Sequence, residues 1–374
     1  MDASPPTANA PPDTSRRHRR GGGEPGFTVV ELMIAMVLSL IIIAGVLSVV
    51  FTSKVTYNEN DRVARTQEAS RAALDMILRD LRGAGFPGCA QPLPGVLQIN
   101  DVLADSNQLL WNFSAPVQGF HAQDGGWIPA LDPAVVPAAL AAALPGSDVI
   151  AVRTVRTGAP AFHTTALTNP SDRNIVVSKA PTERIAPNSP VLISDCANAT
   201  VFVASSFLDA GTTATLGWST GGADPANSGS SLGAAFAAGA QITPVNTVIY
   251  YLAPGTSSAS PSVAPGPSLW RIVGGADPEE VIPGVEALQI QYGVDVDGDT
   301  YADEYDTADV VDAAGNWSNV VSISLALLIR SALPNAPEVD GRQYNLLGTA
   351  FGPFNDHYER TLFTTTVALR ERST

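Results

Sequence analysis

A single carboxylate, Glu31, lies five residues into an otherwise largely apolar run of about 25 residues, Phe27 to Phe51. A run of this length is long enough to cross a bilayer as a helix. An ionised carboxylate costs roughly several kcal/mol in bilayer hydrocarbon, so an acid in such a segment indicates a functional group with a charged or polar partner.

The residues around this acid form a motif. The segment Gly26-Phe-Thr-Val-Val-Glu31 at the start of a membrane helix resembles the processing site of type IV prepilins and pseudopilins. This resemblance implies that a prepilin peptidase cuts after Gly26 and methylates the new terminal amine on Phe27. It also implies that Glu31 pairs with the terminal amine of a neighbouring subunit in a filament. The alternative is an ordinary signal anchor that carries a stray acid.

A second group of acids could bind a metal. Aspartates alternate from residue 295 to residue 306, and alternation in a loop can turn several carboxylates toward one point, as Ca²⁺ requires. The spacing resembles the first nine positions of an EF-hand-type loop. The candidate ligands are the side chains of Asp295, Asp297 and Asp299, the backbone carbonyl of Tyr301, and Asp303 directly or through water.

Two departures separate this loop from an EF-hand. The glycine is Gly298, whereas the EF-hand glycine corresponds to position 300, and the twelfth position is Asp306, where an EF-hand has glutamate. No helical pattern flanks the loop. The alternative to a calcium site is therefore a solvated acidic hairpin tip.

The chain has two cysteines, Cys89 and Cys196. Oxidation is permitted in an exported domain. A disulfide that closes a loop of roughly 100 residues would stabilise the fold by about 4 kcal/mol in the chain-entropy model. We expect this disulfide; two free buried thiols or a metal pair are the alternatives.

Catalytic signals are scarce. His121, His163 and His357 are isolated in the sequence, and no Gly-x-Ser-x-Gly motif is present. The formal net charge of −15 argues against nucleic-acid binding. The sequence therefore predicts a protein that is not an enzyme, with Ca²⁺ as the one candidate cofactor.

The order of segments predicts how these residues are positioned. Residues 1–26 form a leader whose basic cluster, Arg16 to Arg20, stays cytoplasmic and directs export of the C-terminal side. Residues 27–51 form the transmembrane helix, residues 52–83 its amphipathic continuation, and residues 84–374 an exported β-rich head.

One helix is expected from Phe27 to Arg82, because residues 52–82 lack proline and glycine and carry apolar residues at helical spacing. Gly83 and Gly85 end it. Its apolar stripe, which includes Ile77 and Leu81, should pack on the head, and its charged residues, Asp80 among them, should mostly face solvent.

The head has runs of β-branched residues bounded by turn formers, which predict strands. The fold class is therefore α+β: a long N-terminal helix packed on a mainly antiparallel sheet. The head is large for one domain and could contain two lobes. Val320 to Arg330 is nearly all apolar and is expected in mid-sheet. The other predicted strands are residues 148–156, 174–179, 191–195, 200–207, 247–252, 269–273, 285–294 and 362–370.

Short islands across the chain resemble the PilW-type minor pilins. They include Arg71 to Asp80 with the following glycines and Cys89, the Ser-Asp-Cys at residues 194–196, and the acidic loop that starts at Tyr292. Residues 320–330 and 364–370 resemble the last strands of that family, whereas residues 91–190 carry no resemblance.

This resemblance implies a low-abundance subunit that helps to initiate and assemble a type IV pilus. Its partners would be other minor and major pilins, the prepilin peptidase and the bacterial inner membrane. It would cross that membrane once, with its head in the periplasm, and then enter the pilus at the cell surface. The alternatives are a minor pseudopilin of a type II secretion system and a pilin-anchored adhesin.

Overall fold

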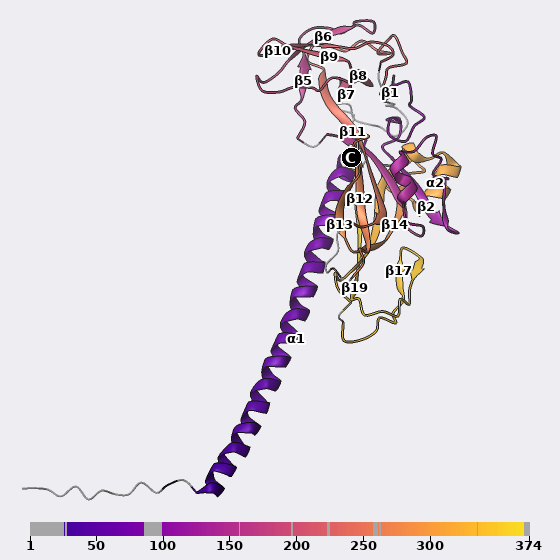
Figure 1. Ribbon diagram of the computed structural model, residues 1–374. Helices are drawn as coiled ribbons and strands as arrows, with labels where there is room; N and C mark the ends of the chain where they lie inside the picture. Colours follow the sequence, from indigo (N-terminus) through magenta and orange to yellow (C-terminus); the bar gives the residue numbers. More distant parts are fainter. Residues whose placement is uncertain are drawn as a thin grey trace, which may run out of the picture. The chain divides into compact units, whose positions relative to one another are not determined.

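The computed structural model describes residues 26, 28–85, 99–156, 158–195, 197–222, 225–256, 261, 263–334 and 336–369. The chain divides into two compact units, residues 1–58 and 59–374. The helix α1 (Val29–Arg82) is unbroken over 54 residues (Figure 1). The predicted long helix is confirmed; it begins two residues later than expected and ends at the expected residue.

The last turns of α1 pack against the head. Ala73, Ile77 and Leu81 lie four residues apart, hence on one face of the helix, and all three are buried. They belong to a core that includes Tyr250 and Leu325 from the sheets. The amphipathic pattern therefore predicted the correct face of this part of the helix.

The expectation that the charges of α1 face solvent is wrong for Asp80. Asp80 is buried, and the hydroxyl of Tyr250 donates a hydrogen bond to its carboxylate at 2.7 Å. Burial raises the pKa of Asp80, although this hydrogen bond opposes the shift. A charged residue on the buried side of a helix needs such a partner, and the partner is 170 residues away in sequence.

Thirteen strands form the larger sheet, which is antiparallel except where β1 and β8 pair in parallel. Its centre is β11 (Gln241–Pro254), a strand of 14 residues. The other strands are β1 (Asn100–Asp101), β2 (Val117–Gln123), β3 (Gly126–Ile128), β4 (Val149–Val155), β5 (Phe162–Thr164), β6 (Asn174–Ser178), β7 (Ser189–Ser194), β8 (Ala199–Ala204), β9 (Ser206–Asp209), β10 (Thr213–Gly217), β12 (Pro267–Val273) and β13 (Glu279–Pro283).

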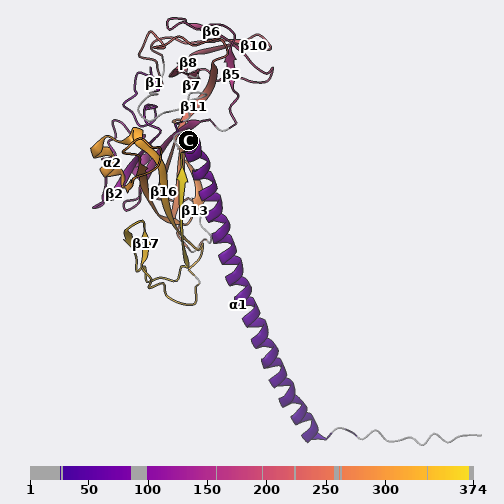
Figure 2. The same ribbon diagram turned by 180° about the vertical axis from the view of Figure 1, so that it is seen from behind.

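The two halves of β11 pair with different neighbours. Residues 241–244 pair with β7 and β5, and residues 245–254 pair with β4 and β12. Figure 2 shows β5, β6, β7, β8 and β10 gathered at one end of β11. This group has its own core around Phe162, Phe202 and Trp218. From the length of the head we considered two lobes. The structure has two groups of strands that share β11, and both belong to a single compact unit.

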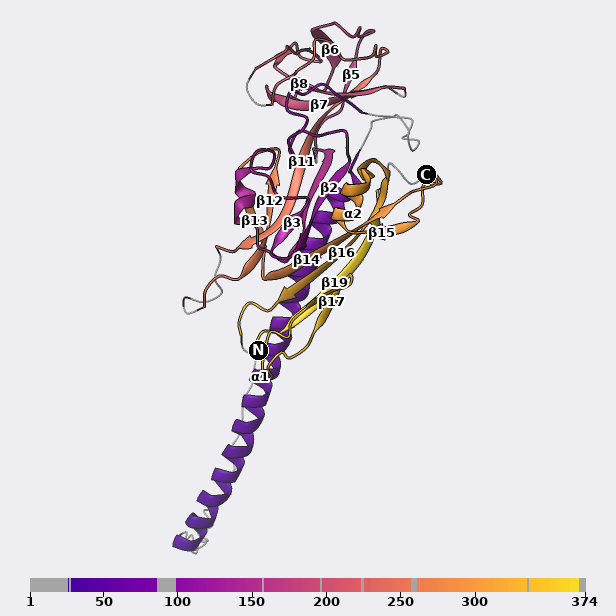
Figure 3. The same ribbon diagram turned by 90° about the vertical axis from the view of Figure 1, so that its right-hand side faces the viewer.

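A smaller sheet has the order β15-β14-β16-β19, and its strands lie side by side in Figure 3. Its strands are β14 (Val285–Val294), β15 (Glu304–Asp306), β16 (Val320–Arg330) and β19 (Arg360–Ala368). The predicted mid-sheet position of residues 320–330 is confirmed, because β16 pairs with β14 on one side and β19 on the other. The remaining elements are α2 (Ala308–Ala314), the 3-10 helices η1 (Ala138–Ala142) and η2 (Trp317–Asn319), and the hairpin of β17 (Tyr344–Leu346) and β18 (Thr349–Phe351).

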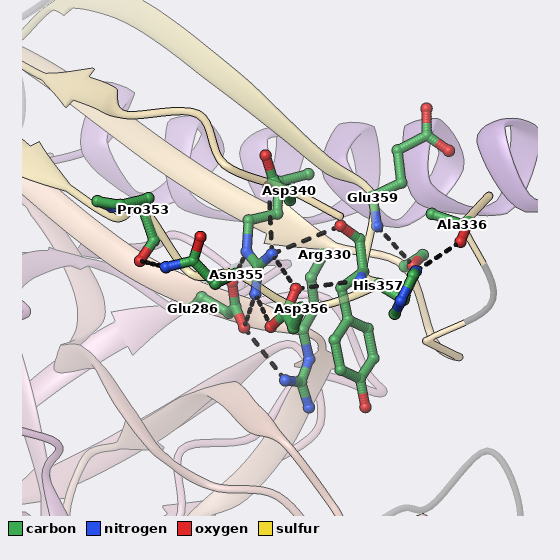
Figure 4. A network of polar contacts seen from close by, with 12 residues as sticks. Glu286, Arg330, Ala336, Asp340, Pro353, Asn355, Asp356, His357 and Glu359 are labelled. Carbon is green, nitrogen blue, oxygen red and sulfur yellow. Dashed lines mark hydrogen bonds and ion pairs between the residues drawn. The ribbon is translucent and has the colours of Figure 1, made fainter. Parts of the chain in front are cut away.

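A network of ion pairs fixes residues 331–359 to the small sheet (Figure 4). Its centre is Arg360 at the start of β19, whose side chain is 1% exposed. The guanidinium bonds both oxygens of Glu286 and both oxygens of Asp356, and it reaches one oxygen of Asp340. Arg330 also bonds Glu286. One buried cation thus joins β14 and β19 to the connecting segment.

Candidate functional sites

The N-terminal end of α1 is closed by reciprocal hydrogen bonds between Thr28 and Glu31. The Thr28 amide and hydroxyl each donate to the Glu31 carboxylate at 3.1 Å, and the Glu31 amide donates to the Thr28 hydroxyl at 3.2 Å. This is a capping box, in which the first residue and the fourth satisfy each other's backbone amides. The acid thus has a local role that we did not expect, although a threonine three residues before a glutamate at the start of an apolar run is its sequence signature.

The segment after this cap has the composition of a membrane span. Residues Val29–Tyr57 have a mean hydropathy of 2.9 over the best window, and none of that window is buried by the rest of the protein. Glu31 is therefore the one acid near the start of an exposed apolar surface. The candidate span ends at Tyr57, six residues past the expected Phe51. Gly26 is exposed, and Phe27, the expected mature N-terminus, lies outside the described residues.

The acidic loop brings three of its expected ligands together. One carboxylate oxygen from each of Asp295, Asp297 and Asp303 lies within 4.8 Å of the other two. Asp299 is not in this group; its carboxylate accepts the amide of Tyr301 at 2.8 Å. Three of the four expected carboxylates thus lie together, and calcium binding stays a prediction.

Backbone amides hold these carboxylates in place. Asp295 is 3% exposed and accepts the amides of Gly298 and Thr300 at 2.7 and 2.9 Å. Asp303 accepts the amide of Val296 at 2.8 Å. These bonds hold the carboxylates close together, which suits a hard cation. The same backbone hydrogen bonds also hold the acidic turn in this conformation without a cation.

The loop has a left-handed residue at the position of the EF-hand glycine. Thr300 occupies the position of the EF-hand glycine and has a φ of +75°. This left-handed conformation costs a β-branched residue about 1–2 kcal/mol. The chain therefore turns at residue 300 although that residue is threonine and not glycine. The threonine is strained in this left-handed conformation.

Calcium should raise the melting temperature of the purified full-length chain, and Asp297→Asn should abolish that rise. Binding to the folded state alone stabilises it by about 2.7 kcal/mol at a hundredfold excess over Kd. Asp299→Asn is the matched control, because Asp299 is a neighbouring loop carboxylate that lies outside the cluster. Equal melting temperatures in calcium and in chelator would leave a solvated acidic turn.

Both cysteines fall outside the described residues, so Cys89 and Cys196 keep the status of a predicted disulfide. The residues that flank Cys196 lie in a turn after β7, where Asp195 accepts the amides of Ala197 and Asn198 at 3.0 and 2.8 Å.

His121 is isolated in sequence but not in the structure. Its Nδ1 lies 3.2 Å from the carboxylate of Asp148, which is buried just before β4. Asp148 also accepts the amides of Ala122 and Ile290, both at 2.8 Å, so it joins β2 to β14. The hydrogen bond to Asp148 raises the pKa of His121 most, burial lowers it, and Asp309 on α2 adds to the rise. The contacts of this pair indicate a structural role, which is to hold β2 and β14 together.

This pair predicts a loss of stability with rising pH. A histidine whose folded pKa lies above its unfolded value of 6.5 contributes fully below pH 6.5, and the contribution disappears as pH rises through the folded pKa. Urea unfolding at pH 6 and pH 8 should show this loss in the wild type and a smaller one in His121→Gln. His163→Gln, at an exposed histidine on β5, should behave as the wild type. Equal pH dependence in both variants would contradict the assignment.

Comparison with known families identifies the C-terminal third of the chain. Residues 249–371 match the family model PilW, described as type IV pilus-assembly protein W. The match begins within β11 and covers the small sheet, the acidic loop and the ion-pair network, so the resemblance is confirmed for this region. No curated protein and no solved structure matches the chain.

Proposed function

We propose that this chain, which carries a C-terminal region of the PilW family of type IV pilus-assembly proteins, is a minor pilin-like subunit that takes part in pilus initiation and assembly. The observation that carries the proposal is the combination of that region with a capped, exposed apolar helix. The family and the fold indicate a structural role in place of a catalytic one.

We further propose that prepilin peptidase removes Met1 to Gly26 and methylates Phe27. The head, residues 84–374, would lie in the periplasm before the subunit enters the pilus. Intact mass of membrane-extracted protein should correspond to a chain that starts at Phe27. A chain that retains the leader, or one cut near Val50, would contradict the processing step.

A deletion strain tests the function itself. Loss of the chain should reduce surface pili, and the wild-type chain should be found in sheared pili together with other pilins. A normal pilus count in the deletion strain, with defective export of secreted enzymes, would instead favour a minor pseudopilin of a type II secretion system.

A pilin-anchored adhesin is the second candidate. The strand group β5–β10 has a core of its own and lies outside the matched region, so it is a candidate for a separate binding role. Specific binding of the purified protein to host or matrix surfaces, with pilus number unchanged in the deletion strain, would favour this function.

A disulfide between Cys89 and Cys196 should be present in the exported protein. It would close a loop of roughly 100 residues and contribute about 4 kcal/mol. Non-reducing peptide mapping should recover the linked pair, and Cys196→Ser should lower the melting temperature. If both thiols react with an alkylating agent without reductant, the pair is absent.

A further inference from the structure

The two edges of the small sheet differ in their protection. β15 is an edge strand of three residues, two of them acidic. β19 is an edge strand of nine residues, and all nine pair with β16 without a bulge. A long regular edge exposes a row of backbone groups that can pair with another chain.

The register shows which groups of β19 point outward. The amide of Leu369 donates to Val321, and the carbonyl of Glu359 accepts from Ser331, so odd-numbered residues face β16. In an antiparallel ladder, alternate residues then point their amides and carbonyls away from the partner strand. Within the described part of the chain, no backbone hydrogen bond reaches these outward groups. They belong to Leu362, Thr364, Thr366 and Ala368.

The usual protective features are missing from this strand. Residues 361–368 contain no charge, no proline and no glycine. By contrast, β13 carries two glutamates and ends at Pro283, and β9 is four residues long and ends at Asp209, which pairs with Lys179. Since sheet edges are normally blunted by such features, an unblunted edge indicates a surface that is covered in use.

The side chains of β19 indicate what covers it. Phe363 is half-buried and packs on the core that α1 completes. Thr364, Thr366 and Ala368 lie on the opposite face and are exposed. An added strand would therefore extend the core with apolar residues on the face of Phe363 and present small or polar residues on the other face.

We propose that β19 is the docking edge for an extended, uncharged segment of another pilus subunit, with apolar and polar residues in alternation. The segment adds to the small sheet as a further strand through backbone hydrogen bonds. The inference rests on the proposed function, because it takes the partner from the pilus.

Thr364→Pro tests the edge directly. Proline removes the outward amide and leaves the ladder to β16 intact, since this amide makes no bond in that ladder. Thr364→Ala removes the same side chain and keeps the amide. We expect Thr364→Ala to enter sheared pili at the wild-type level and Thr364→Pro to be lost from them, with equal melting temperatures for the two purified full-length proteins.

The outcomes are separable. If both variants enter pili at the wild-type level, the docking edge is overturned and the proposed function stands. If both variants are lost from pili, the docking edge is also overturned, because the loss then does not depend on the amide of residue 364. A photo-reactive residue at position 366 should crosslink to another pilus subunit, and crosslinks to a second copy alone overturn the stated partner. Absence of the wild-type chain from sheared pili overturns both proposals.

If Thr364→Pro melts lower than Thr364→Ala, amide hydrogen exchange on the wild type decides. The amides of Leu362, Thr364 and Thr366 should exchange at least roughly tenfold more slowly in the pilus fraction than in detergent-solubilised subunit, because docking ties them into a ladder. Equal exchange in the two samples overturns the proposal.

Discussion

Glu31→Ala should leave processing and membrane insertion intact and abolish pilus assembly. The side chain lies at the start of an exposed apolar span, and among the described residues its hydrogen-bond partner is Thr28. Loss of a helix cap costs about 1 kcal/mol, whereas an ionised carboxylate without a cation costs several kcal/mol in hydrocarbon. We therefore expect the charge, paired with the terminal amine of a neighbouring subunit, to dominate the effect.

Two further variants separate capping from charge. Glu31→Gln removes the charge but keeps the capping geometry, because the side-chain amide oxygen of glutamine can also accept the backbone N–H of Thr28. Thr28→Val removes the hydroxyl of the cap and keeps the charge. If pairing between subunits governs assembly, Glu31→Gln fails as Glu31→Ala does, and Thr28→Val still assembles.

Electron microscopy of surface pili and immunoblots of sheared pili measure this result, and inner-membrane fractions verify insertion. Normal pili in the Glu31→Gln strain would reject the charge pairing. Loss of pili in the Thr28→Val strain alone would instead assign the role of Glu31 to the helix cap.

The helix and the longest strands could be predicted from sequence because their signals are local. The end of α1 follows from the glycines after Arg82, and the centre of the small sheet follows from the apolar run at residues 320–330. The strands that we did not predict are short or rich in small residues, as in β5 and β10, and they form because neighbouring strands offer backbone partners. The residues of such a strand carry no sequence pattern that would predict this pairing.

The polar contacts could not be predicted from the sequence, because their partners are far apart in the chain. Asp80 meets Tyr250, and His121 meets Asp148, across distances in sequence that no spacing rule covers. In the acidic loop the spacing was informative because the ligands are neighbours, yet it could not show that Asp299 turns away from the cluster. Local patterns predicted the candidate groups, and the fold decided which of them meet.

Arg360→Met should destabilise the head by about 3–5 kcal/mol, because removal of one partner leaves buried charges uncompensated. The substitution keeps an unbranched apolar stem and removes the guanidinium. Glu286 and Asp340 have side chains that are 9% and 2% exposed, so solvent cannot replace the lost bonds. Urea unfolding should show the loss as a lower midpoint. Arg342→Met is the matched control: Arg342 also bonds Asp340, but its own side chain is 61% exposed. Asp340 keeps Arg360 and Tyr344 as partners in this variant, so the expected loss is smaller.

A second substitution tests the cause of that loss. Without Arg360, the two remaining arginines of the network, Arg330 and Arg342, are outnumbered by its three carboxylates. Adding Glu286→Gln removes the excess negative charge, so the double variant should unfold at a higher urea concentration than Arg360→Met alone. The wild-type network should also resist acid. Burial raises the pKa of Asp340, but the hydrogen bonds from Arg342 and Tyr344 outweigh it and hold the pKa at about 2. The stability that this group contributes is present above its unfolded pKa, near 4, and is lost only as pH falls toward 2. A double variant no more stable than Arg360→Met would show that stacking of the guanidinium on the Phe354 ring, and not its ion pairs, holds the connecting segment in place.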